Sequence, residues 1–142
     1  NKECIKTVKK DLTPNETEKK AIEIITQGLV DLSILNGELN ELIEKGAYRD
    51  FYMHRVGHWM GMDVHDVGSY GLNGKWRKYA PGMITTIEPG IYFKENLKNV
   101  PKEYLNIGIR IEDDVLVTEG DPEVLTSSVP KTIIEIEKVM GS

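Results

Sequence analysis

The sequence has few of the features that support several common classes of protein. It contains one cysteine, Cys4, which leaves no partner for a disulfide within the chain and is typical of a reducing compartment. No apolar run approaches the roughly 18 residues that a membrane helix needs. The formal net charge is −5 and the basic residues are dispersed, so we expect no nucleic-acid partner. These absences predict a cytoplasmic protein without a membrane partner.

The N-terminal segment NKECIKTVKK lacks the apolar stretch of a signal peptide and has no initiator methionine. We therefore expect a piece of a longer protein. Cys4 lies in this polar segment, which we expect to be frayed, and we assign it no catalytic role. The length of 142 residues fits one domain with a buried core.

Helices are predicted near both ends of the chain. Thr13 and Glu16 have the spacing of a capping box, and Pro14 suits a first helical position, so a helix begins near Thr13. Its apolar stripe is expected to face the core and comprises Ile22, Ile25 and Leu29. Residues 36–46 predict a shorter helix that ends at Gly46. The C-terminal PKTIIEIEKVMGS predicts a final helix with Pro130 at its start.

The sequence between these predicted helices is expected to form mainly strands and turns. Residues 68–82 are rich in glycine, aromatic and basic residues and predict a surface loop. MITTIEPGIYF is a β-rich run that stops at Pro89–Gly90. In NIGIRIEDDVLVTEG the isoleucines alternate with polar residues, and Asp113–Asp114 predicts a turn or bulge. The pattern indicates an α+β fold with at least one antiparallel pairing.

All three histidines lie in HRVGHWMGMDVHDVG, residues 54–68. A lone histidine is more often structural than functional, but His54, His58 and His65 set among glycines indicate a site on strand ends and turns. Glu88 ends an apolar strand and is either solvated or directed into a cleft. Glu112 shares a strand face with Arg110, so these two residues alone also fit an ordinary surface ion pair.

His58, Glu88 and Glu112 together offer one nitrogen and two carboxylates. This donor set suits Mn²⁺, Co²⁺, Fe²⁺ or Zn²⁺. The absence of nearby thiolates argues against a structural zinc cage, and no HExxH motif is present. Sequence spacing does not by itself bring the three residues together.

Three blocks in this order carry a family resemblance: MHRVGHWMGMDVHDVG, PGMITTIEPGIY and GIRIEDDVLVT. They resemble the Xaa-Pro aminopeptidase (aminopeptidase P) family of the pita-bread metallopeptidases, which also include prolidase, creatinase and methionine aminopeptidase. VHDVG and GIRIEDD are more similar to aminopeptidase P or prolidase than to methionine aminopeptidase. The resemblance implies the C-terminal half of a pita-bread fold, with helices packed on a curved, mainly antiparallel sheet.

The resemblance also implies the roles of the site residues. His58 would be the imidazole ligand of a dinuclear metal centre, Glu88 both a ligand and the acid/base group, and Glu112 the bridge between two divalent ions, with Mn²⁺ the first candidate. His65 would stabilise the oxyanion, and His54 would help place the substrate or move protons. Arg110 would hold the carboxylates and offset their charge. The substrate would be a peptide with proline in second position, which loses its N-terminal residue.

Members of this family carry two further aspartate ligands and another histidine upstream. Here no histidine precedes His54, and Asp11 and Asp31 lie in or beside predicted helix. We therefore expect residues 1–142 to form the C-terminal part of a catalytic domain, with three of five ligands and little activity alone. An exposed sheet edge would favour homo-oligomers or self-association.

Three alternatives stay open at this point. A prolidase-type dipeptidase has the same fold. A non-catalytic peptide- or protein-binding module could reuse the half-fold, although it would not need His58, Glu88 and Glu112 together. A mononuclear non-haem iron enzyme ranks last, because such sites usually have two histidine ligands.

Overall fold

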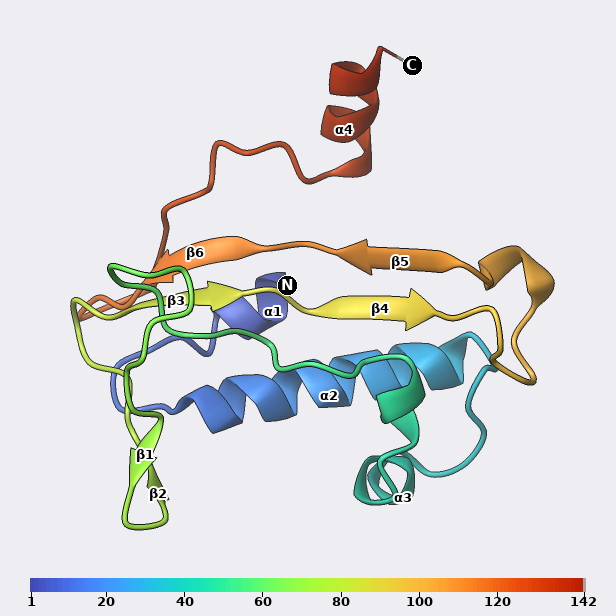
Figure 1. Ribbon diagram of the computed structural model, residues 1–142, viewed down its shortest axis with the longest axis horizontal. Coiled ribbons are helices and arrows are strands. Elements are labelled where there is room, and N and C mark those ends of the chain that lie inside the picture. The colour runs from blue at the N-terminus through green and yellow to red at the C-terminus, as the bar shows by residue number, and fades with distance from the viewer. Residues whose placement is uncertain (142) are drawn as a thin grey trace.

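Helix α2 (Pro14–Asp31) is the longest element and runs beneath the strands for much of the molecule's length (Figure 1). The computed structural model describes residues 1–141. The backbone N–H of the N-cap residue Thr13 donates to Glu16 Oε2 at 2.7 Å, which confirms the predicted capping box. Local sequence therefore determines where this helix begins.

The other helices are short. They are α1 (Lys2–Ile5), α3 (Leu39–Glu44), α4 (Ile133–Met140) and the 3-10 turns η1 (Ala47–Asp50) and η2 (Lys102–Tyr104). Gly46, with φ of 67°, follows α3 and confirms the predicted stop. Helix α4 is capped by Thr132, so it begins beyond Pro130 rather than at it. Helix α1 and both 3-10 turns were not predicted.

The strands pair only in antiparallel fashion within residues 1–141. One sheet has the order β3-β6-β7 and a second pairs β4 with β5; their bounds are β3 (Ile84–Ile87), β6 (Asp113–Leu116), β7 (Glu123–Val124), β4 (Gly90–Phe93) and β5 (Ile107–Arg110). The predicted surface loop contains a small hairpin, β1 (Gly71–Leu72) and β2 (Lys75–Trp76).

The two larger ladders share one register. Ile87 pairs with Asp113 at the end of β3·β6, and Gly90 pairs with Arg110 at the start of β4·β5. If the register of the first pair is continued by one residue, Glu88, which follows Ile87, lies opposite Glu112, which precedes Asp113. The carboxylates therefore meet where the regular pairing is interrupted.

The expected turn or bulge at Asp113–Asp114 was wrong. Both residues belong to β6, and the Asp113 carboxylate is buried. Lys131 Nζ lies 3.0 Å from its Oδ1, and the Thr126 hydroxyl donates to the same oxygen at 2.6 Å. These partners lie well beyond β6 in the sequence, so the local pattern did not reveal that a buried aspartate would be satisfied there.

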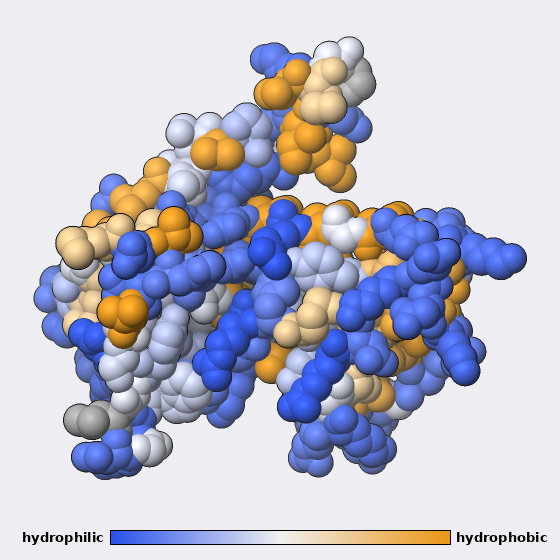
Figure 2. Space-filling view, viewed as in Figure 1, coloured by the Kyte–Doolittle hydropathy of each residue, from blue (hydrophilic) through white to orange (hydrophobic). Residues whose placement is uncertain are grey.

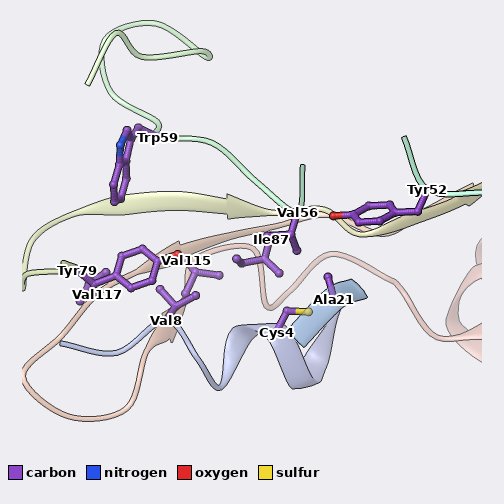
Figure 3. Packing of buried hydrophobic residues seen from close by; sticks show 10 residues of the cluster. All are labelled: Cys4, Val8, Ala21, Tyr52, Val56, Trp59, Tyr79, Ile87, Val115 and Val117. Carbon is purple, nitrogen blue, oxygen red and sulfur yellow. The ribbon is translucent and has the colours of Figure 1, made fainter. Parts of the chain in front are cut away.

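The main core lies between α1, α2 and β3·β6 (Figure 3). The prediction that Cys4 sits in a frayed segment was wrong, because the side chain is 1% exposed and belongs to this cluster. Cysteine behaves here as a small apolar residue. Burial raises the pKa of its thiol. A second cluster beneath β4 contains Leu29, Ile34, Phe51 and Phe93.

Helix α4 projects from the body of the molecule (Figure 1). Its apolar side chains are exposed and colour this helix orange in Figure 2; they are Ile133, Ile134, Ile136, Val139 and Met140. Ile107 and Ile109 of β5 are exposed as well. Within residues 1–141, no helix combines the length and apolar character needed to cross a membrane.

Candidate metal centre

The segment that carries the histidines runs along β3. Three backbone hydrogen bonds join them: Met60 N–H to Ile84 O at 3.1 Å, Thr86 N–H to His58 O at 2.9 Å, and Glu88 N–H to Val56 O at 2.6 Å. A Cβ at Gly57 would collide with the carbonyl oxygen of Thr86. The close approach of these two backbones therefore requires glycine, and it sets His58 beside the end of β3.

His58, Glu88 and Glu112 converge, as the family resemblance implied. Each offers one ligand atom, and the three atoms all lie within 4.8 Å of one another. Glu88 is 8% exposed, His58 is half-buried and Glu112 is exposed. The donors come from three separate segments that only the sheet brings together.

The hydrogen bonds of His58 determine which nitrogen faces the cluster. Its Nδ1 lies 3.0 Å from the carbonyl oxygen of Trp59, which can only accept, so Nδ1 carries the proton. Nε2 lies 3.3 Å from Glu88 Oε1. An imidazole nitrogen and a carboxylate oxygen this close together are a donor pair of the kind that binds a divalent metal.

Thr86 supports both ligands. Its hydroxyl accepts from the backbone N–H of His58 at 3.0 Å and donates to Glu88 Oε1 at 3.1 Å. Thr86 and Glu88 are two residues apart along the end of β3, so their side chains project to the same face. The hydroxyl thus holds the carboxylate in place.

Charges of both signs meet at this cluster. Arg110 Nη1 lies 3.4 Å from Glu88 Oε2. Partial burial, together with the charges of Glu88 and Asp114, raises the pKa of Glu112. Two carboxylates held this close without full compensation from Arg110 favour a bound dication.

A tyrosine joins two further residues that the sequence singled out. Tyr92 OH accepts from Arg110 Nε at 2.8 Å and lies 3.0 Å from His54 Nε2. His54 Nδ1 donates to the carbonyl oxygen of Arg55 at 2.7 Å. A Cβ at Gly108, across the strand from Tyr92, would press on its ring.

His65 lines the same cavity. Its ring packs edge-on against His58, with 4.4 Å between ring centroids. The cavity has a volume of about 420 Å³, within the range of small-ligand sites. Its lining includes His54, Arg55, Gly57, His58, His65, Tyr70, Trp76, Glu88 and Arg110. All three histidines therefore face one cavity.

Sequence reasoning missed Thr86, Tyr92 and the pocket residues Arg55 and Trp76. Thr86 and Trp76 had a usable signal. Thr86 precedes Glu88 by two residues on the same strand face. The approach of Trp76 to the pocket depends on the β1–β2 hairpin, and the Asn73–Gly74 pair at its turn, where both residues have positive φ, is a hairpin signal that sequence reasoning overlooked. The position of Tyr92, diagonal to Arg110, depends on the β4·β5 register.

The sequence and the fold are similar to those of a known family of enzymes. A family model described as "Metallopeptidase family M24" matches residues 1–119. The chain belongs to metallopeptidase family M24. The Xaa-Pro aminopeptidase of Haemophilus influenzae is 53% identical over 134 residues, which cover 92% of this chain and 31% of that protein. The Xaa-Pro aminopeptidase of Escherichia coli is 48% identical over 125 residues, which cover 88% of this chain and 28% of that protein.

Solved structures agree with the M24 assignment. Aminopeptidase PepP of Pseudomonas aeruginosa superposes with a TM-score of 0.92 and 48% identity, covering 98% of this chain and 32% of that one. Aminopeptidase P of E. coli with the inhibitor Pro-Leu superposes with a TM-score of 0.91 and 43% identity, covering 99% of this chain and 31% of that one. The pita-bread fold is thereby confirmed. The chain spans less than a third of the length of these relatives.

Proposed function

We propose that this M24 chain contributes part of the active site of an Xaa-Pro aminopeptidase, which removes the N-terminal residue from peptides with proline in second position. The observation that carries the proposal is the approach of ligand atoms of His58, Glu88 and Glu112 to within 4.8 Å of one another, beside a cavity that His58 and Glu88 line. The similarity to Xaa-Pro aminopeptidases across 92% and 88% of the chain supports it. We propose that residues 1–142 are the C-terminal part of the catalytic domain.

His58, Glu88 and Glu112 would hold two divalent ions, with Glu112 as the bridge. We propose Mn²⁺, with Co²⁺, Zn²⁺ and Fe²⁺ as the other candidates for this mixed donor set. A solved structure titled as Zn-substituted E. coli aminopeptidase P in complex with product supports a divalent-metal site. When bound, the ions supply a nucleophilic hydroxide at neutral pH. Two aspartates outside this chain would complete the ligand set.

The residues of this chain would then share the remaining tasks. Glu88, with one oxygen held by Thr86 and the other facing Arg110, would pass a proton to the leaving proline nitrogen. That nitrogen has no hydrogen of its own in the peptide, so the proton must be delivered to it. His65 would donate a hydrogen bond to the oxygen on which negative charge develops. His54 would hold Tyr92 and, through it, Arg110.

A prolidase-type dipeptidase remains the second candidate, because the same site could cleave Xaa-Pro dipeptides. A binding module is disfavoured, because peptide binding does not require an imidazole and two carboxylates gathered at one point. We also propose a cytoplasmic location, which the single cysteine supports, and association between copies through β5. The isolated chain should bind Mn²⁺ weakly and show little turnover.

A chimera tests the proposal. Residues 1–142 would replace the matching segment of the E. coli Xaa-Pro aminopeptidase, which supplies its own upstream part. With Mn²⁺, the chimera should hydrolyse an Ala-Pro-Pro peptide. Glu112→Gln keeps the shape but removes the bridging charge, so activity should fall by more than the roughly 10–100-fold typical of residues that only support ligands.

The matched control is Glu123→Gln on β7, which makes the same change at an exposed position away from the cavity. It should leave turnover unchanged. Wild-type turnover in the Glu112→Gln chimera would show that Glu112 does not bridge metal ions. A folded chimera that binds Mn²⁺ but never cleaves Xaa-Pro peptides would refute the proposed reaction.

A further inference from the structure

Arg55 and Trp76 form a cation–π pair in the wall of the site cavity. Both residues line the cavity beside His54, His58 and Glu88. The Arg55 guanidinium carbon lies 5.1 Å from the centroid of the Trp76 ring. Trp76 belongs to β2 of the hairpin and is 38% exposed. The hairpin therefore presents an aromatic face on which this arginine rests.

The two arginines of the cavity differ in what they bind. Arg110 is engaged by Glu88 and Tyr92. Across residues 1–141, Arg55 forms no ion pair with a carboxylate, and its guanidinium lies over the indole of Trp76. Arg55 is thus a cation that lines the cavity without an anionic partner.

A cation–π contact prepares a guanidinium for one kind of ligand. The aromatic ring covers one face of the plane and restricts its orientation, while the N–H groups at the edge stay available. Those N–H groups match the two oxygens of a carboxylate in a bidentate arrangement. A peptide substrate always has such a group at its C-terminus, and a short peptide brings it close to the scissile bond because each extended residue spans about 3.3–3.6 Å.

We propose that Arg55, held by Trp76, binds the C-terminal carboxylate of short Xaa-Pro peptides and so gives this site a preference for them. The inference rests on the proposed function, since it assumes that a peptide occupies the cavity. It identifies Arg55 as a specificity-determining residue and Trp76 as the residue that positions it.

Binding to the full 142-residue chain tests this without requiring turnover. The chain has two tryptophans, so indole N–H signals in proton–nitrogen correlation spectra report directly on Trp76, with the buried Trp59 as reference. The probes are Ala-Pro and Ala-Pro amide, each with and without Mn²⁺. Ala-Pro should bind about tenfold more tightly, which is typical of one hydrogen-bonded charge pair.

Arg55→Gln should remove this tenfold difference, whereas Arg55→Lys should keep only part of it. The matched control is Arg77→Gln: Arg77 also lies over an indole, with its guanidinium 5.8 Å from the Trp59 centroid, but it does not line this cavity. That variant should retain the full preference. Equal binding of the two peptides by the wild-type chain, or no binding of either, would overturn the inference.

A third peptide identifies the source of the carboxylate. Ala-Pro-Glu amide carries its negative charge on a side chain, and we expect it to bind as weakly as Ala-Pro amide. Binding as tight as that of Ala-Pro would overturn the assignment to the C-terminus. The chimera tests the proposed reaction separately. An inactive chimera together with Arg55-dependent peptide binding would refute the reaction but not the role of Arg55. An active chimera without Arg55-dependent binding would refute the role of Arg55 but not the reaction.

Discussion

Glu88 and Glu112 lie directly opposite each other in a shared antiparallel register. Ile87 pairs with Asp113 on one side of them and Gly90 with Arg110 on the other. Neither glutamate belongs to a regular strand, since β3 ends before the first and β6 begins after the second. Strand pairing on both sides thus aligns two carboxylates whose mutual repulsion would otherwise separate them.

The packing of Tyr92 against Gly108 leads to a first prediction. Gly108→Ala would place a methyl group against the Tyr92 ring, move its hydroxyl and break the contacts to His54 and Arg110. We expect a loss of about 1–3 kcal/mol in the free energy of unfolding, measured in urea. The chimera should also lose turnover. Gly120→Ala, where nothing lies within 4 Å, should change stability by less than about 0.5 kcal/mol.

Thr86→Val tests the support of the ligands. Valine has nearly the same shape but leaves the His58 N–H and Glu88 Oε1 without their hydroxyl partner. Stability should fall by about 1–3 kcal/mol, and Mn²⁺ affinity of the chimera by roughly 10–100-fold.

Thr26→Val serves as the control for Thr86→Val. Thr26 is fully buried too, but its hydroxyl donates to the Ile22 carbonyl within α2. This variant should leave Mn²⁺ affinity unchanged when measured by calorimetric titration. A loss of affinity as large as that of Thr86→Val would mean that general destabilisation, rather than support of the ligands, explains the effect.

The ionisation of buried Tyr79 should lower the stability of the protein at alkaline pH. Burial raises the pKa of Tyr79 from 10.0 to about 12. Because the native pKa is the higher one, its contribution is complete below pH 10 and is lost as the pH rises through 12. Thermal melts across this window should show a falling free energy of unfolding, with roughly 2–3 kcal/mol attributable to this group.

Tyr79→Phe should make the decline with pH shallower, although it also removes the 3.2 Å hydrogen bond with Thr17 and so lowers stability at neutral pH. The slope of the free energy of unfolding between pH 10 and 12 separates the loss of ionisation from the loss of the hydrogen bond, since only the ionisation depends on pH. An unchanged slope in Tyr79→Phe would show that other groups cause the alkaline loss.

Association between copies is the last prediction. Ile109 of β5 is 55% exposed, and β5 pairs only with β4 within the part of the chain that the structure describes. Such an edge is a ready site for pairing with another chain. Sedimentation velocity at low and high concentration should show a weight-average coefficient that rises with concentration. Ile109→Lys should reduce the rise, whereas Val67→Lys, at an exposed position outside the strands, should not.

Prediction from sequence succeeded where local chemistry determined structure. The start of α2 follows from Thr13 and Pro14, and the three motif blocks identified His58, Glu88 and Glu112 before any geometry was known. The roles assigned to the site residues and the boundaries of the domain stay predictions.

Sequence reasoning failed where distant partners decide the outcome. Cys4 is buried because α1 packs on α2 and β6, which a short polar segment does not reveal. Asp113 continues a strand because Lys131 and Thr126 satisfy it. The contact of Tyr92 with both His54 and Arg110 required the register of β4 and β5.

The register shared by the two ladders ties correct folding to correct alignment of the site. Successive side chains of a strand point to opposite faces, so a slip of β6 by one residue would turn Glu112 away from His58. The same slip would move Val115, which is fully buried, out of the core. Misaligned molecules would therefore lose their packing, and errors of register should accumulate in the unfolded or aggregated fraction rather than as native-like chains with a defective centre.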